Sequence, residues 1–495
     1  MSLLHWEVGI SSRVWLTLLA AAVLAGCGGT VEKQSTDVPA VPGDSRSADA
    51  TDTGLDRQDV ADLDSGTPGQ DTVDSDAAGP DAVDLDASAP EVTNDADSSS
   101  SDLADGAVEP VAPGTLLWRY EHKLTVDYGP AIDSVGNLYF QGNTTVATDP
   151  DGPTLISLTP DGELRWGVRN VPGSVPAPPV TIAGKMLVVP ATRSDTEELL
   201  GRVSLYSLEG DPLGQLDTDG PMGDGAAWTA QGLVVAPARS VFAFDGEVPA
   251  WDKPFALIGK GLTGTNVAVS PQGILYVGCR GEDKNLYAIN QADGAELWRR
   301  NTGDVYLSPL AVDFEGNVYA VDFGGLLSVV APGGGELWTA KVGDGSGIAL
   351  GGDGTVYLST AVGYIEGTLL ALRKGADGKA ELVWERWLQH QGINTPALSD
   401  GGTVYLGDNC RRFLAVDAAT GDELWSFIPP EIDPAEDICA GGWSSATIGP
   451  DGTVYASTSH PGFLHAFAGD GTGLAQDSPW PMDFHDAAHT GSLEQ

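Results

Sequence analysis

The residues best suited to chemistry in this sequence are two histidines near its C-terminal end. His485 and His489 are four residues apart, and Asp486 lies between them. On one turn of a helix this spacing could bring two imidazoles to a metal ion. A zinc site needs at least a third protein ligand, which the sequence does not designate. We therefore expect no metal site, and no cofactor, at these histidines.

A second position with its own chemistry is Cys27, at the end of an apolar leader. The apolar run Val14–Ala25 has 12 residues, whereas a transmembrane helix needs about 20, so the run is typical of a signal peptide. Leu24-Ala25-Gly26-Cys27 resembles the lipobox of bacterial lipoproteins. The resemblance implies that residues 1–26 are removed and that Cys27 carries a lipid anchor. An ordinary secretory signal or an uncleaved anchor is the alternative.

Residues 27–113 are expected to form a disordered acidic linker behind that cysteine. They are rich in Asp, Ala, Ser, Thr and Pro and poor in aromatic residues, so they cannot bury enough apolar surface to offset the entropy of ordering. Irregular aspartate spacing without repeated glycines argues against calcium loops. The whole chain has 70 acidic and 25 basic residues, for a net charge of -45, which excludes nucleic acid as a main partner.

The other three cysteines suggest one disulfide and one inert thiol. Cys410 and Cys439 flank the strand predicted around Trp425, and an exported chain is in an oxidising compartment. A disulfide between them would hold the acidic insertion that begins at Glu431. Cys279 follows a predicted strand, where a buried unreactive thiol is the common case.

Residues 114–495 consist of repeats that predict an all-β fold. A glycine precedes a short apolar strand eight times, at intervals of 38 to 50 residues: Gly136, Gly184, Gly232, Gly273, Gly316, Gly354, Gly402 and Gly452. Such a period, with several short strands per unit, is typical of a β-propeller. We expect eight blades, or seven if the unit at residues 187–216, which lacks a tryptophan, is degenerate. The strand predicted at residues 116–120 would complete the last blade and close the ring.

One repeat resembles a known family. Ala415-x-Asp417-x-x-Thr420-Gly421-x-x-x-Trp425 resembles the repeat of the pyrroloquinoline quinone (PQQ) propellers, in which the tryptophan packs between blades. The resemblance implies structural blade tryptophans at Trp118, Trp166, Trp298, Trp338 and Trp425, whereas Trp384 departs from the pattern. The C-terminal residues 478–491 also resemble a closing segment of such propellers, which implies that the two histidines form hydrogen bonds with the ring.

The resemblance leaves two classes of function open. PQQ dehydrogenases have two adjacent cysteines over the quinone and a bound calcium, and no two cysteines are adjacent here. Other relatives are lipoproteins of the outer membrane that bind proteins. We therefore expect a non-catalytic lipoprotein of the cell envelope and outer membrane, which binds a protein or glycan partner through loops of one ring face. A degenerate quinone-dependent oxidoreductase or a polysaccharide-active enzyme is the alternative.

Overall fold

Strands form wherever the repeat places β-branched and aromatic residues between glycine turns. The computed structural model describes residues 111–494 except 145–151, 171–177, 194–199, 258–261, 281–282, 304–308, 323, 363–365, 393, 433–441 and 460–461. The described residues form strands and turns, with no helix. Within them, accordingly, no helix is long and apolar enough to span a membrane. The leader, the linker up to residue 110, Cys27 and Cys439 lie outside the described residues.

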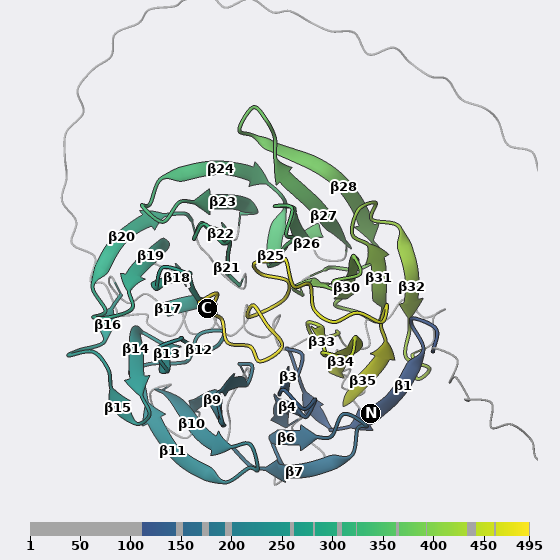
Figure 1. The fold of residues 1–495 in the computed structure, drawn as a ribbon, viewed down its shortest axis with the longest axis horizontal. Coiled ribbons are helices and arrows are strands. Elements are labelled where there is room, and N and C mark those ends of the chain that lie inside the picture. The colour runs from purple at the N-terminus through teal and green to yellow at the C-terminus, as the bar shows by residue number, and fades with distance from the viewer. Residues whose placement is uncertain are drawn as a thin grey trace, which may run out of the picture. The chain divides into compact units, whose positions relative to one another are not determined.

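Eight antiparallel sheets stand around a common axis as the blades of a propeller, so the predicted eight-bladed fold is confirmed (Figure 1). Blade 1 is β3 (Ala131–Ile132), β4 (Leu138–Gln141), β6 (Leu155–Leu158) and β7 (Leu164–Val168). Blade 2 is β8 (Thr181–Ala183), β9 (Met186–Arg193), β10 (Leu200–Ser207) and β11 (Pro212–Asp217). Blade 3 is β12 (Ala227–Trp228), β13 (Leu233–Pro237), β14 (Ser240–Asp245), β15 (Val248–Pro249) and the added β16 (Phe255–Ala256).

The next three blades follow in chain order around the ring. Blade 4 is β17 (Leu262–Val269), β18 (Ile274–Arg280), β19 (Asn285–Asn290) and β20 (Glu296–Asn301). Blade 5 is β21 (Ala311–Val312), β22 (Val318–Val321), β23 (Leu326–Val330) and β24 (Glu336–Lys341). Blade 6 is β25 (Asp344–Leu350), β26 (Val356–Val362), β27 (Glu366–Lys374) and β28 (Ala380–Leu388).

The last blade combines the first strand of the described chain with its last three strands. Blade 7 is β29 (Ala397–Leu398), β30 (Thr403–Gly407), β31 (Phe413–Asp417) and β32 (Glu423–Phe427). Blade 8 is β33 (Thr447–Ile448), β34 (Thr453–Ser459), β35 (Gly462–Ala468) and β1 (Leu116–Glu121), and a separate pair is β2 (Leu124–Thr125) with β5 (Asn143–Thr144). Because the N-terminal β1 pairs with β35, the ring closes through the predicted N-terminal strand.

The apolar core lies between the blades. Most of its clusters combine side chains from two neighbouring blades, such as blades 3 and 4 or blades 7 and 8. In six of the eight interfaces a tryptophan lies against a positive-φ glycine of the following blade. The pairs are Trp118–Gly162, Trp166–Gly210, Trp251–Gly294, Trp298–Gly334, Trp384–Gly421 and Trp425–Gly114. Only glycine leaves room for the indole there, because an added methyl group would lie 3.1 Å or less from the ring.

The indole N–H groups fix the depth of this contact. Five of them donate a hydrogen bond to a carbonyl in the outer turn, which joins the third and fourth strands, of the following blade. The bonds are Trp118 to Pro160 (2.9 Å), Trp166 to Leu208 (3.1 Å), Trp251 to Gln291 (2.8 Å), Trp298 to Pro332 (2.6 Å) and Trp384 to Ala418 (2.9 Å). Each interface thus buries a large apolar ring without burying an unpaired donor.

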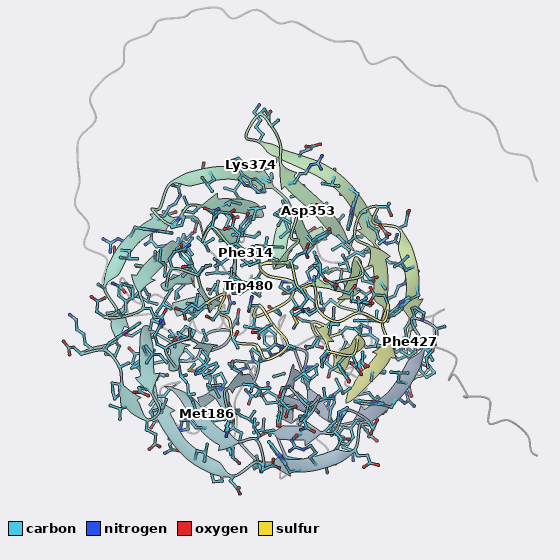
Figure 2. All side chains as sticks on the ribbon, viewed as in Figure 1. Met186, Phe314, Asp353, Lys374, Phe427 and Trp480 are labelled. Carbon is cyan, nitrogen blue, oxygen red and sulfur yellow. The ribbon has the colours of Figure 1, made fainter. Side chains whose placement is uncertain are left out.

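The C-terminal residues 474–494, here called the closing segment, lie across the centre of one ring face (Figure 1). Six backbone carbonyls of its residues 480–491 accept N–H groups from six blades, at 2.7 to 2.9 Å. The donors are Ile132, Ile182, Trp228, Val269, Leu350 and Leu398. Trp480, at the centre of the ring in Figure 2, is fully buried, as are Met482 and Phe484. The segment therefore covers the axis and ties opposite blades together.

We predict that the indole contact, and not the positive φ alone, makes glycine necessary in the outer turns. Gly421 (φ 76°) and Gly378 (φ 81°) have the same backbone conformation. A methyl group at Gly421 would lie 2.6 Å from the Trp384 ring, whereas at Gly378 nothing lies within 4 Å. Both alanine variants should lose about 1 kcal/mol through backbone strain. Gly421→Ala should lose a further 1–3 kcal/mol, roughly, through overpacking. Equal decreases in thermal midpoint would contradict this.

We also predict that the burial of neutral His489 in the closing segment lowers the stability of the fold at acid pH. Burial lowers the pKa of this imidazole to about 4, from about 6.5 in an unfolded chain. Below pH 6.5 the unfolded chain therefore binds a proton that the folded chain does not, and stability falls until the pH approaches 4. The loss from this group is at most about 3 kcal/mol. Between pH 7.5 and 5, the thermal midpoint of the wild type should fall relative to that of His489→Asn. If the thermal midpoints of the wild type and of His489→Asn change equally with pH, His489 does not destabilise the fold at acid pH.

Candidate functional site: a pocket between the first and second blades

One blade departs from the repeat on the face that carries the closing segment. The inner turn, which joins the first and second strands, has four or five residues in seven blades, such as residues 133–137 in blade 1 and 229–232 in blade 3. In blade 2 it has only two, Gly184 and Lys185. A two-residue hairpin needs positive φ, and Gly184 has a φ of 63°.

The short turn leaves an open pocket of about 460 Å³ between its longer neighbours. The walls come from the inner turn of blade 1, from the inner and outer turns of blade 2 and from Trp228 of blade 3, while Ala488 and Thr490 of the closing segment complete the lining. The indole of Trp228 lies over the turn, because a methyl group added at Gly184 would be 3.6 Å from its ring. This volume is within the range of ligand-binding pockets.

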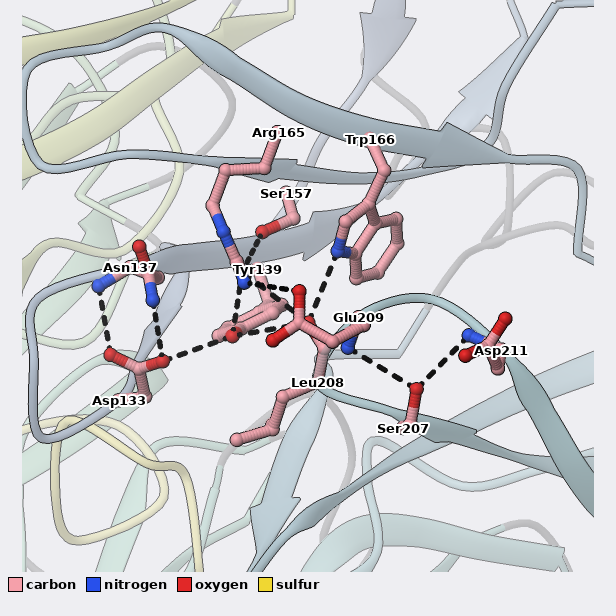
Figure 3. Close-up of polar contacts among 10 residues, drawn as sticks. All are labelled: Asp133, Asn137, Tyr139, Ser157, Arg165, Trp166, Ser207, Leu208, Glu209 and Asp211. Atoms are coloured by element: carbon pink, nitrogen blue, oxygen red, sulfur yellow. Dashed lines mark hydrogen bonds and ion pairs between the residues drawn. The ribbon is translucent and has the colours of Figure 1, made fainter.

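One wall is held rigid by Asp133 (Figure 3). Its Oδ1 accepts the backbone N–H groups of Val135 (3.0 Å) and Asn137 (2.8 Å), and its Oδ2 accepts the Asn137 side-chain amide (2.9 Å) and the Tyr139 hydroxyl (3.0 Å). Asp313 of blade 5 accepts the equivalent bonds from Asn317 and Tyr319. The repetition shows that this carboxylate supports the turn rather than a reaction.

The other wall contains Arg165, whose guanidinium joins blades 1 and 2. Its Nη1 donates to Tyr139 Oη (2.9 Å) and Ser157 Oγ (2.8 Å), and its Nη2 donates to Glu209 Oε2 (3.0 Å). Burial, with the charge of Asp133, raises the pKa of Tyr139 to about 12, so the phenol stays protonated. Comparable pairs, Arg300–Glu336 and Arg386–Glu423, join blades 4 and 5 and blades 6 and 7.

The polar side chains of the pocket lining are bonded to one another. Its charged groups are engaged in fixed hydrogen bonds, and no serine or cysteine in its lining contacts a histidine that could serve as a base. In the part of the chain that the structure describes, no group of three His, Cys, Asp or Glu residues is arranged to hold a metal ion.

The histidines singled out in the sequence lie in turns of the closing segment, not on a helix. The buried His489 has its Nδ1 3.1 Å from the Val180 carbonyl of the ring, and the His485 ring packs 5.2 Å from that of Trp480. Burial raises the pKa of Asp486, but hydrogen bonds from His485 and Thr490 outweigh it and hold the pKa below its usual value.

The two described cysteines differ in their bonding state. Cys279 is a free, fully buried thiol, and burial together with the nearby Asp283 raises its pKa. Cys410 is buried and disulfide-bonded. Because Cys439 is outside the described residues, the Cys410–Cys439 pairing stays a prediction, as does the lipid anchor at Cys27.

Sequence reasoning missed two blade tryptophans and the pocket itself. Trp251 and Trp384 have the same contacts as the blade tryptophans on the PQQ pattern. Trp338 lacks the glycine contact, because Gly378 of the following blade is too far away. The signal for the pocket was present in the sequence, because the turn before Met186 is two or three residues shorter than the other inner turns.

The comparisons with known proteins agree with this fold. Residues 322–478 match the family model described as outer membrane protein assembly factor BamB. No curated protein matches the chain.

The similar solved structures include a BamB protein and an alcohol dehydrogenase. BamB from Moraxella catarrhalis is 13% identical with a TM-score of 0.52, covering 72% of this chain and 98% of its own. Quinohemoprotein alcohol dehydrogenase from Comamonas testosteroni is 13% identical with a TM-score of 0.54, covering 72% and 76%. At this identity both similarities define the fold alone. The repeat and the eight-bladed ring define the fold as a β-propeller, and the family match over residues 322–478 supports a PQQ-like repeat in that part of the chain.

Proposed function

We propose that the chain is a non-catalytic binding module of the cell envelope that recognises a protein partner with the face carrying the closing segment. The observation that carries the proposal is the pocket. It arises where one repeat departs from the others, and its walls are fixed by Asp133 and Arg165 without any reacting group. The matching family model is that of an assembly factor for outer membrane proteins, which is consistent with a protein as partner.

The closing segment directs binding away from the axis on this face. Trp480, Met482 and Phe484 of this segment are fully buried, so their apolar surface is not accessible to a partner. The exposed apolar side chain beside the pocket is Val135, which is 72% exposed. A partner would therefore contact the pocket and its rim.

The second candidate is a quinone-dependent oxidoreductase, which is favoured by the similarity to the Comamonas testosteroni enzyme. That similarity concerns the fold, and the adjacent cysteines of such enzymes are missing from the sequence. Stoichiometric uptake of PQQ and calcium by the full chain, with reduction of a dye by an alcohol, would replace the binding proposal by this one.

We predict that a photoreactive residue at the pocket captures a specific protein in intact cells. Benzoylphenylalanine in place of Val135 should give one reproducible protein adduct on irradiation, because this side chain is exposed at the rim. The control is the same substitution at Leu382, which is 52% exposed on β28 at the outer edge of blade 6. The proposal fails if Val135 gives no adduct, or only those that Leu382 also gives.

We propose further that Cys27 anchors the module to the outer membrane, with residues 28–113 as a spacer. Two or more acyl chains bind a membrane stably. The variant Cys27→Ser should therefore change from the membrane fraction to the soluble fraction after cell lysis, and should no longer incorporate labelled palmitate. Cys279→Ser, which changes a buried free thiol, is the matched control and should stay in the membrane fraction. Unchanged membrane association of Cys27→Ser would refute the anchor.

A further inference from the structure

We propose that the pocket between blades 1 and 2 receives a basic side chain, Arg or Lys, of the protein partner. This inference rests on the proposed function and names the chemistry that the pocket recognises. Three features of the lining carry it: an apolar interior, unused acceptors at the rim, and a net negative charge.

The interior suits the methylene part of a long basic side chain. Ile132 and Ile182, each 6% exposed or less, and Ala488 line the pocket, and the Trp228 ring forms one side. Lys and Arg side chains bury their methylene stems along apolar surface and keep the charged group near water. An indole face also attracts a cation. The pocket therefore offers an apolar path that leads to a polar opening.

The opening supplies two accessible acceptors. Arg165 is the strongest donor of the lining, and its Nη atoms are engaged with Tyr139, Ser157 and Glu209. Glu209 Oε2 receives that bond, whereas no described residue donates to Glu209 Oε1. This side chain is 74% exposed, so the second oxygen is accessible to a partner. Likewise no described residue donates to Asn137 Oδ1, while its Nδ2 is bound to Asp133.

The charges favour a cation at both short and long range. Asp133, Glu209 and Arg165 line the pocket, so that two carboxylates face one guanidinium. An anionic group would meet this excess negative charge, and a neutral sugar would leave it uncompensated. The net charge of -45 on the whole chain would also accelerate the approach of a basic partner.

The test uses the full-length chain in detergent and a fluorescent peptide, Gly-Gly-Arg-Gly-Gly. Parallel titrations use the same peptide with Lys, or with citrulline, a neutral analogue of Arg, in place of Arg. The Arg peptide, the Lys peptide or both should bind saturably, and citrulline should bind at least about tenfold more weakly, because a charge-assisted hydrogen bond is lost. Equal binding of citrulline, or no saturable binding of either basic peptide, would overturn the inference.

Two matched variants locate the binding. Glu209→Gln and Asp211→Asn each remove one negative charge from the same outer turn of blade 2, and only Glu209 lines the pocket. Glu209→Gln should weaken binding of the basic peptide about tenfold, and Asp211→Asn less than twofold. Equal weakening would show a general attraction to an acidic surface and would contradict a specific pocket. Circular dichroism checks that both variants fold.

A longer inner turn in blade 2 tests the shape of the pocket independently of its charge. Replacing Gly184-Lys185 by the four-residue inner turn of blade 3, residues 229–232, should fill the pocket and abolish peptide binding while Glu209 and Arg165 remain. Retained binding would place the peptide elsewhere.

The two proposals can also fail separately. If the Val135 adduct forms but neither basic peptide competes with it, the basic side chain is refuted and the binding module stands. If no adduct forms, the proposed function itself fails.

Discussion

The ring depends on an indole ring lying on a glycine of the next blade. A sheet of four short strands cannot bury both of its faces alone, so each blade is stable only against its neighbours. The tryptophan of the fourth strand fills the widening gap between two blades near the outer edge, and its N–H binds a carbonyl of the opposite turn. Because the glycine has a positive φ and no side chain, the turn and the ring approach closely.

The blades beside the two interfaces without this contact are also the least regular ones. Blade 2 has no tryptophan in β11, and its inner turn is the shortest of the eight. Between blades 5 and 6, the longer β27–β28 hairpin extends outside the ring, and its glycine is out of reach of Trp338 (Figure 1). Departures from the repeat thus produce the pocket and the projecting hairpin.

The sequence was sufficient for the fold because its signals are local. Each strand-preceding glycine, such as Gly136 or Gly452, has the positive φ that its turn requires, and this requirement is visible in a few consecutive residues. Ring closure was also predictable, since the first and last partial units complement each other. Trp251 was missed because blade 3 has its tryptophan beyond the short β15 rather than within a long fourth strand.

The pocket could not be predicted in the same way, because it forms only when three blades and the closing segment meet in space. Asp133, Trp228 and Thr490 are far apart in the chain, and no single motif contains two of them. The short turn of blade 2 is visible in the sequence. Whether it leaves a pocket depends on blades 1 and 3 and on the closing segment, which form the other walls. The roles of the histidines likewise depend on burial within the assembled ring.

The closure of blade 8 has a mechanical consequence. The chain enters the propeller through Gly114 and Thr115, which exchange hydrogen bonds with Ala468 at the start of the outermost strand, β1. Tension transmitted along the polypeptide from its N-terminal side is therefore applied to the edge of the ring and not to its centre. This load would separate β1 from β35 one hydrogen bond at a time. The contact between Gly114 and the Trp425 ring would resist the separation. The contacts of β1, including the Trp118 hydrogen bond to blade 1, would therefore set the force at which the ring opens.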